Sequence, residues 1–123
     1  MAYTILVVEH RLSYYRLVKR HLNDKGHDAE RAATPQEALR FFDKEKHYGV
    51  LADHDLRDNS PERMNGLELL RRLRKQGARV TVLMTENHDV YSKAQPDITC
   101  VTTKDNLGET VDILLKAILK AQQ

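Results

Sequence analysis

Side chains that can bind a phosphate and a divalent cation follow four short apolar runs of the sequence. They are Glu9 with His10, Asp53 with His54 and Asp55, Thr85 with Glu86, and Lys104 with Asp105. Carboxylates hold a hard cation, a lysine ammonium neutralises phosphoryl oxygens, and a hydroxyl donates a hydrogen bond to them. Gathered on one rim, these groups would form a site for a phosphate and a divalent cation.

The elements that must position these side chains alternate between strand and helix. The run "TILVV" (4–8) is continuously apolar, which is typical of a strand covered on both faces. Further strands are predicted at 28–33, 48–53, 79–85 and 98–103. The alternation predicts an α/β fold, a single doubly wound five-stranded parallel sheet with helices on both faces. In such a sheet ligands bind at the carboxyl ends of the strands, where the side chains above lie.

Helices are expected between these strands from apolar stripes and capping signals. A first helix has its stripe at Leu12, Tyr15, Val18 and Leu22 and stops near Gly26. Thr34 to Glu37 forms a capping box with Pro35 at the first helical position, opening a helix through about Lys44. A third helix has its stripe at Leu67, Leu70 and Leu73 and ends at Gly77. Residues 86–97 predict a short helix at best, and the last helix has its stripe at Leu107, Val111, Leu114 and Ile118.

Composition is that of an ordinary soluble domain. The 123 residues suffice for one core and are 41% hydrophobic and 31% charged, with a net charge of +2. That balance does not indicate nucleic-acid binding, and the basic run at 71–79 reads as the solvated face of an amphipathic helix. A lone Cys100 excludes an internal disulfide, and no apolar run approaches the roughly 20 residues of a membrane span. No signal-peptide pattern opens the sequence, so we expect a cytoplasmic protein with no membrane partner.

Four motifs at the strand ends carry a family resemblance. "ILVVEH", "LADHDL" with "MNGLELL", "VLMT" and "TTKDNLGE" together resemble the receiver domain of response regulators in bacterial two-component signalling. Each motif is weak alone, but four in order on the expected elements are specific. The resemblance covers essentially the whole chain, and it implies one flavodoxin-like receiver domain over residues 1–123.

The resemblance also implies a role for each strand-end residue. Asp53 would accept a phosphoryl group from a histidine kinase or phosphotransfer protein. Glu9 and Asp53 would hold Mg²⁺, Thr85 would donate a hydrogen bond to the phosphoryl oxygens, and Lys104 would pair with them. The domain would catalyse only its own phosphorylation in a phosphorelay, rather than act as an enzyme on a diffusing substrate. Its expected partners are the phosphodonor and a downstream protein. Whether two copies of the chain also form a homodimer, as receivers often do, stays open.

Four departures from the family pattern bear on this reading. His10 takes the second acidic position, and imidazole is a poor ligand for Mg²⁺, which prefers oxygen. Asp105 follows Lys104 where the family usually has proline, and Val101 stands where many members carry an aromatic residue. The segment from Asp53 to Gly66 is longer than usual. These departures favour, as the alternative function, a degenerate pseudo-receiver that binds a protein partner without phosphorylation.

Other interpretations of the strand-end residues stay open. Asp55 is the rival phosphoacceptor, because "DLR" also resembles the family's sequence after its aspartate. His10 and His54 together with Glu9 and Asp53 offer ligands for zinc or another softer metal. The geometry is unfavourable, because His54 would point to the opposite side from Asp53 if the strand continues. A small-ligand binder on the same fold is the weakest option, because no glycine-rich phosphate loop follows "TILVV".

Overall fold

The structure, a computed structural model, describes residues 2–56, 63–85, 98–101 and 107–122. Within these residues, five strands and four helices position the strand-end residues. The strands are β1 (Thr4–Val8), β2 (Asp28–Ala32), β3 (His47–Asp53), β4 (Val80–Met84) and β5 (Thr99–Val101). The helices are α1 (Leu12–Asp24), α2 (Pro35–Phe41), α3 (Gly66–Lys75) and α5 (Leu107–Ala121).

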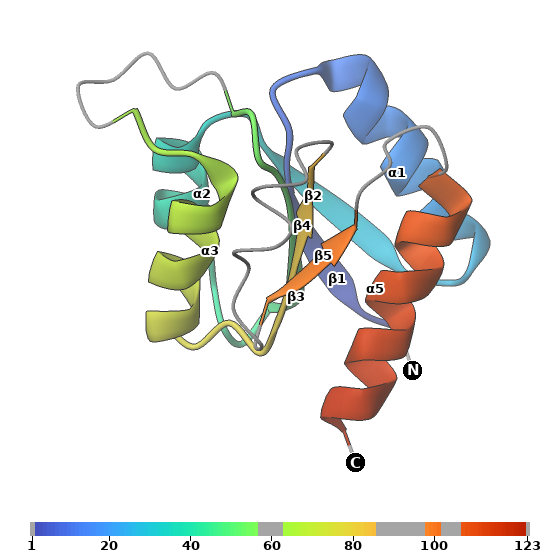
Figure 1. Ribbon diagram of the computed structural model, residues 1–123. Helices are drawn as coiled ribbons and strands as arrows, with labels where there is room; N and C mark the ends of the chain where they lie inside the picture. Colours follow the sequence, from blue (N-terminus) through green and yellow to red (C-terminus); the bar gives the residue numbers. More distant parts are fainter. Residues whose placement is uncertain (1, 57–62, 86–97, 102–106, 123) are drawn as a thin grey trace.

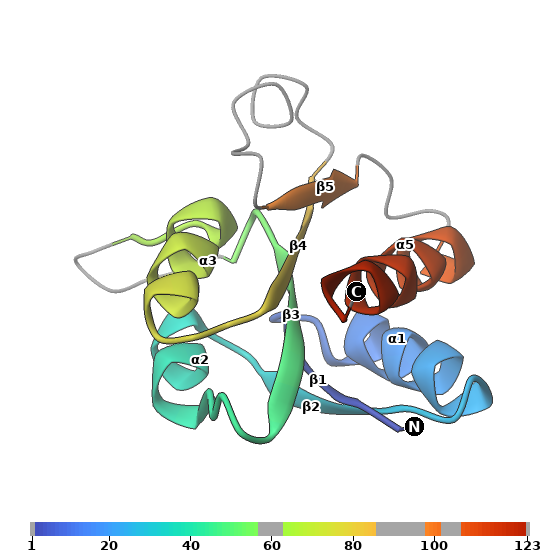
Figure 2. The same ribbon diagram turned by 90° about the horizontal axis from the view of Figure 1, so that it is seen from below.

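The strands form one parallel sheet in the order β2-β1-β3-β4-β5. Helices α2 and α3 cover one face of the sheet, and α1 and α5 cover the other (Figures 1 and 2). The order reverses direction between β1 and β3, which makes the carboxyl ends of these two strands the topological switch point where ligands bind in open α/β sheets. The predicted doubly wound parallel fold is confirmed.

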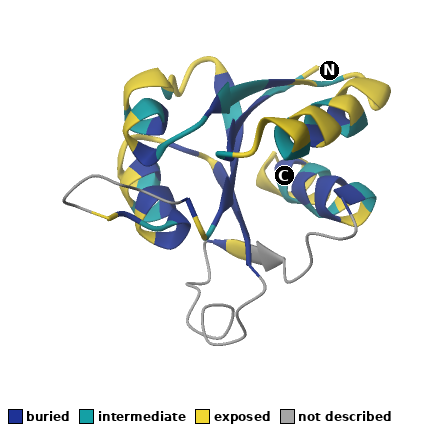
Figure 3. Ribbon diagram, turned by 90° about the horizontal axis from the view of Figure 1, so that it is seen from above, coloured by how far each residue is buried: buried dark blue, intermediate teal, exposed yellow. Residues whose placement is uncertain are grey.

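Two apolar cores flank the sheet, and the strands contribute alternate residues to them. In β1, Leu6 and Val8 face the core beneath α2 and α3, whereas Ile5 and Val7 face the core beneath α1 and α5. Figure 3 shows the consequence, with buried residues along the strands and on the inner sides of the helices. Since the strands are covered on both faces, the functional side chains are confined to the strand ends.

Local signals set the helix boundaries largely as predicted. The Thr34 hydroxyl accepts a hydrogen bond from the Glu37 amide at 3.1 Å, and Pro35 opens α2. Gly26 and Gly77 adopt positive φ after α1 and α3, at +85° and +105°. The stripe of the last helix, Leu107, Val111, Leu114 and Ile118, is buried as expected.

Helix α2 is shorter than predicted, ending at Phe41 rather than near Lys44. The reason is a turn before β3. The Asp43 amide donates a hydrogen bond to His47 Nδ1 at 3.0 Å, and the His47 amide donates to the Asp43 carbonyl at 2.7 Å. These bonds take the chain out of the helix and into the strand. The short helix expected within 86–97 and the end of the strand predicted at 98–103 lie outside the described residues.

Candidate functional site

The carboxyl ends of three neighbouring strands bring the predicted site residues to one edge of the sheet. Val8 of β1 pairs with Ala52 of β3, and Asp53 pairs with Met84 of β4. The hydrogen bonds between β1 and β2 continue one residue beyond β1, because the Glu9 amide donates to the carbonyl of Ala32 in β2 at 3.0 Å. Because the strands are parallel and in register, Glu9 and Asp53 emerge at the same level.

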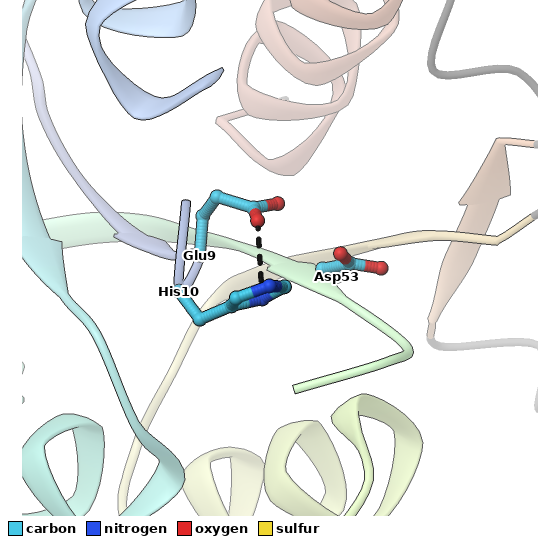
Figure 4. Close-up of side chains that lie close together, drawn as sticks. All are labelled: Glu9, His10 and Asp53. Carbon is cyan, nitrogen blue, oxygen red and sulfur yellow. Dashed lines mark ion pairs between the residues drawn. The ribbon is translucent and has the colours of Figure 1, made fainter. Parts of the chain in front are cut away.

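Glu9, His10 and Asp53 form a cluster that we call the acidic cluster (Figure 4). One ligand atom from each residue lies within 4.8 Å of the others. The Nδ1 atom of His10 is buried and lies 3.5 Å from Oε1 of Glu9. Glu9 is 0% exposed and Asp53 is 1% exposed, so two carboxylates are held together away from water. Charges in this situation require cationic or hydrogen-bonding partners.

Arg11 supplies a permanent cation to this cluster. Its backbone amide and its Nε atom both donate hydrogen bonds to Oε1 of Glu9, at 3.1 and 3.2 Å. Its guanidinium also lies 4.8 Å from the centre of the Tyr14 ring. Burial lowers the pKa of Arg11, but the hydrogen bond and charge of Glu9, together with the charge of Asp53, outweigh that effect and raise it. The guanidinium is therefore electrostatically coupled to both carboxylates.

The backbone of the acidic cluster is anchored from β2. Arg31 Nε donates to the Glu9 carbonyl at 3.1 Å, and Arg31 Nη2 donates to the His10 carbonyl at 2.6 Å. One side chain thus fixes the two consecutive residues that face Asp53. The Asp55 amide likewise donates to Oδ1 of Asp53 at 3.1 Å, which orients that carboxylate.

Gly66 permits α3 to begin against the end of β3. A Cβ atom at this position would lie 2.2 Å from the carbonyl oxygen of Asp53 and 2.9 Å from Cα of His54. The Gly66 amide donates to the His54 carbonyl at 3.0 Å, and Asn65 caps the helix by accepting a hydrogen bond from the Glu68 amide at 2.9 Å. Only glycine allows this approach of backbone to backbone.

The structure brings together some of the predicted residues and says nothing of others. Glu9, His10 and Asp53 converge, and Thr85 is buried directly after β4. Asp55 is exposed, and its amide donates to Oδ1 of Asp53. Lys104 and Asp105 lie outside the described residues, as do the side chain of Val101 and residues 57–62 of the long segment. The phosphoacceptor and metal roles of these residues remain predictions.

Arg11 and Arg31 are the two site residues that the sequence analysis missed. Arg11 follows the "EH" pair directly, so its place at a strand end was a usable signal. Arg31 lies in the weak strand motif "DAERAA", where a charged residue reads as solvent-facing. Its reach across to β1 could not be read from the linear pattern.

The donor set of the acidic cluster fits Mg²⁺ poorly. Mg²⁺ takes octahedral oxygen coordination, and Glu9 and Asp53 can supply carboxylate oxygens. His10 supplies nitrogen in place of a third carboxylate, and Arg11 already donates two hydrogen bonds to Glu9. The candidate ligand group found within residues 2–56, 63–85, 98–101 and 107–122 contains His10 but not His54, so the softer-metal site that we considered loses one of its four donors.

A search of the helices in the described residues for one long and apolar enough to cross a membrane finds none.

Comparisons with known proteins identify the family. The sequence model of the response regulator receiver domain matches residues 5–100. NtrX from Brucella abortus is 25% identical with a TM-score of 0.76, and the match covers 99% of this chain and 28% of NtrX. A transiently phosphorylated switch in bacterial signal transduction is 23% identical with a TM-score of 0.74, and both chains are covered over 100% of their length.

A third solved structure, a CheY-like response regulator receiver domain protein from Methanospirillum hungatei JF-1, is 19% identical. Its TM-score is 0.74, with 99% of this chain and 98% of that chain covered. These likenesses support the fold, and this chain spans only about a quarter of NtrX. With the match over residues 5–100, the chain belongs to the response regulator receiver domain family.

Proposed function

We propose that this receiver domain accepts a phosphoryl group on Asp53 from a histidine kinase or phosphotransfer protein. The observation that carries the proposal is the position of Asp53 at the carboxyl end of β3, within 4.8 Å of Glu9 and His10 at the topological switch point. The domain shares its fold with a transiently phosphorylated switch in bacterial signal transduction.

The proposed step is a phosphoryl transfer between two side chains. A carboxylate oxygen of Asp53 attacks the phosphorus atom of a phosphohistidine, the new P–O bond forms, and the P–N bond breaks. The electron pair of that bond returns to the donor imidazole, which takes up a proton. The product is a mixed anhydride on Asp53, and the domain catalyses only its own modification.

Two further groups would stabilise the transferred phosphoryl group. Thr85 follows Met84, which pairs with Asp53, so its hydroxyl is suited to donate to a phosphoryl oxygen. We assign the ammonium of Lys104 to a second phosphoryl oxygen from the resemblance of "TTKDNLGE" alone. Movement of these two groups toward the phosphoryl group would change the surface presented to a downstream protein. Because its proposed phosphodonors act in the cytoplasm, we place the domain there.

Acetyl phosphate, a small-molecule phosphodonor, tests the proposal. The chain is incubated with it, with and without MgCl₂, and its intact mass is measured. We expect one phosphate adduct in the wild type and in Asp55→Asn, and none in Asp53→Asn. Loss of the adduct in Asp55→Asn alone would assign the acceptor to Asp55. A folded wild-type chain without any adduct would contradict phosphorylation.

The second candidate is a pseudo-receiver that binds its protein partner without phosphorylation. It is favoured by the imidazole of His10 at the second acidic position and by the guanidinium that Arg11 places on Glu9. The imidazole replaces an oxygen ligand for Mg²⁺, and the guanidinium occupies a carboxylate oxygen that could bind the ion. Both changes weaken the binding of the Mg²⁺ that would bring an anionic phosphodonor to an anionic acceptor. The same mass measurement separates the two candidates, because a pseudo-receiver would stay unmodified while remaining folded.

A further inference from the structure

We propose that Arg11 takes the place of the divalent cation at the acidic cluster, so that the folded domain holds Glu9 and Asp53 together without a bound metal ion. The inference concerns the site of the proposed phosphoryl transfer and builds on that assignment. The experiments that test it use no phosphodonor, so their results do not depend on whether Asp53 can be phosphorylated.

The two carboxylates of the acidic cluster need a cation nearby. Glu9 is 0% exposed and Asp53 is 1% exposed, and their ligand atoms lie within 4.8 Å of one another. Two carboxylates this close repel each other and have lost most of their hydration. A bound cation in such a site offsets the repulsion between the two carboxylates.

Arg11 reaches Glu9 from the start of α1. Residue 11 is the N-cap of α1, so its backbone position is set by the helix that follows. From there its amide and Nε atom both reach Oε1 of Glu9, at 3.1 and 3.2 Å. The Tyr14 ring lies 4.8 Å from the guanidinium carbon, and the Tyr14 hydroxyl contacts Sδ of Met84 at 3.7 Å. The cation is thus positioned by contacts from β1, α1 and, through Tyr14, β4.

Arg11 also reduces the negative charge that the acidic cluster offers to a metal ion. Glu9 and Asp53 contribute −2 and Arg11 contributes +1, which leaves −1 for these three side chains. His10 adds no negative charge in either protonation state, whereas an acidic residue at this position would add one. A divalent ion entering the cluster would also approach the guanidinium that is bound to Glu9. The cluster therefore attracts Mg²⁺ much less than a cluster of three carboxylates.

A guanidinium is suited to this position. It stays protonated throughout the physiological range, it is more weakly hydrated than an ammonium, and it stacks on aromatic rings. Its side chain here is 44% exposed, yet its Nε atom reaches the fully buried carboxylate of Glu9. Because the guanidinium belongs to the chain itself, the carboxylates keep a cation even when no metal ion is available.

Thermal unfolding of the full chain in EDTA or in about 10 mM MgCl₂, at matched ionic strength, tests the inference. The variant is Arg11→Gln, and the matched control is Arg16→Gln, which removes the same charge from an exposed position of α1. For the wild type, and likewise for Arg16→Gln, we expect the same unfolding midpoint in EDTA as in MgCl₂. Arg11→Gln should melt lower in EDTA and regain much of the loss in MgCl₂. Calorimetric titration with MgCl₂ should show at least about tenfold tighter binding to Arg11→Gln than to the wild type.

Each contrary outcome overturns the inference. Mg²⁺ that stabilises the wild type as much as Arg11→Gln would show that Arg11 does not stand in for the ion. Insensitivity of both proteins to Mg²⁺ would show that the ion cannot replace Arg11. If Arg11→Gln does not fold in EDTA, folding on addition of MgCl₂ supports the inference, and failure to fold with MgCl₂ contradicts it.

Discussion

Gly66 lies so close to Asp53 that a Cβ atom on the glycine would stand 2.2 Å from the aspartate carbonyl oxygen. The first turn of α3 is therefore built directly against the end of β3, and the residue proposed to accept the phosphoryl group shares its backbone environment with that helix. A shift of α3 would therefore displace the backbone of Asp53 directly, without an intervening side chain. This contact couples the site to a helix on the surface of the domain.

Replacing Gly66 by alanine should destabilise the domain. The new methyl group would collide with the Asp53 and His54 backbone, and relief of such overpacking typically costs about 1–3 kcal/mol. Gly49→Ala is the matched control, because a Cβ there would make contacts of 3.4 Å or more with side chains only. The free energy of unfolding from urea denaturation checks the prediction. A Gly66→Ala protein as stable as Gly49→Ala would contradict the close approach.

Arg31 should be needed to hold residues 9 and 10 in place. Arg31→Gln loses the hydrogen bonds to the Glu9 and His10 carbonyls, at 3.1 and 2.6 Å. Hydrogen bonds to charged groups contribute about 1.5–3 kcal/mol each, so we expect a loss of at least about 1.5 kcal/mol in unfolding free energy. Hydrogen exchange should also be faster at the amides of Glu9 and Arg11. Arg20→Gln, at an exposed position of α1, should show neither effect; equal behaviour of the two variants would refute the anchoring role.

The pair of Glu30 and His47 should add to stability at neutral pH and lose its effect in acid. Hydrogen bonds from Lys46 first and from His47 second lower the pKa of Glu30, and the His47 bond measures 2.8 Å. His47 Nδ1 accepts from the Asp43 amide, so its ring proton lies on Nε2 and points to Glu30. A lowered pKa means that the stabilisation is present above the ordinary glutamate pKa and disappears as the pH falls through the lowered one.

Glu30→Gln is the variant for this pH dependence. It should be less stable than the wild type at pH 7, with a difference that shrinks as the pH falls below about 4. The difference should be modest, because the Glu30 side chain is 40% exposed. Glu45→Gln, at an exposed position of the preceding turn, provides the control. A Glu30→Gln deficit that is the same at every pH would count against a stabilising role for the charged Glu30 carboxylate.

His10→Asp should strengthen Mg²⁺ binding. The change adds an oxygen ligand and a negative charge next to Glu9 and Asp53. A unit charge at about 4 Å interacts by several kcal/mol at an effective dielectric constant of about 20, so a gain of about tenfold or more in affinity is expected. His10→Asn separates the two causes, because it adds the oxygen without the charge. Calorimetric titration that ranks His10→Asp no tighter than the wild type would show that residue 10 does not face the ion.

Much of the fold could be predicted because its physical causes are local. Apolar runs such as "TILVV" indicated most of the strands, and stripes such as Leu107 to Ile118 indicated the helix faces that are buried. Caps gave boundaries where the cap is made by neighbours in sequence, as with Thr34 and Glu37. Helix α2 was predicted too long because its end is followed by a turn with hydrogen bonds between Asp43 and His47, which leave no mark in the pattern of apolar residues.

The site could be predicted in part for a similar reason. The carboxyl ends of parallel strands meet at one edge, so Glu9, His10 and Asp53 were expected to converge, and they do. The contacts of Arg11 and Arg31 depend on side-chain conformations and on the approach of β2 to β1, which no spacing in the sequence records. These two arginines set much of the charge and rigidity of the site.

Chemical mapping of the modified residue is the most direct test of the central claim that Asp53 is the phosphoacceptor. Sodium borohydride reduces the acyl phosphate of a phosphorylated aspartate to an alcohol, which leaves homoserine at that position. The chain is treated with acetyl phosphate, reduced, digested and analysed by peptide mass spectrometry. We predict homoserine at position 53 and nowhere else, and no homoserine in Asp53→Asn. Homoserine at position 55, or none in a folded chain, would contradict it.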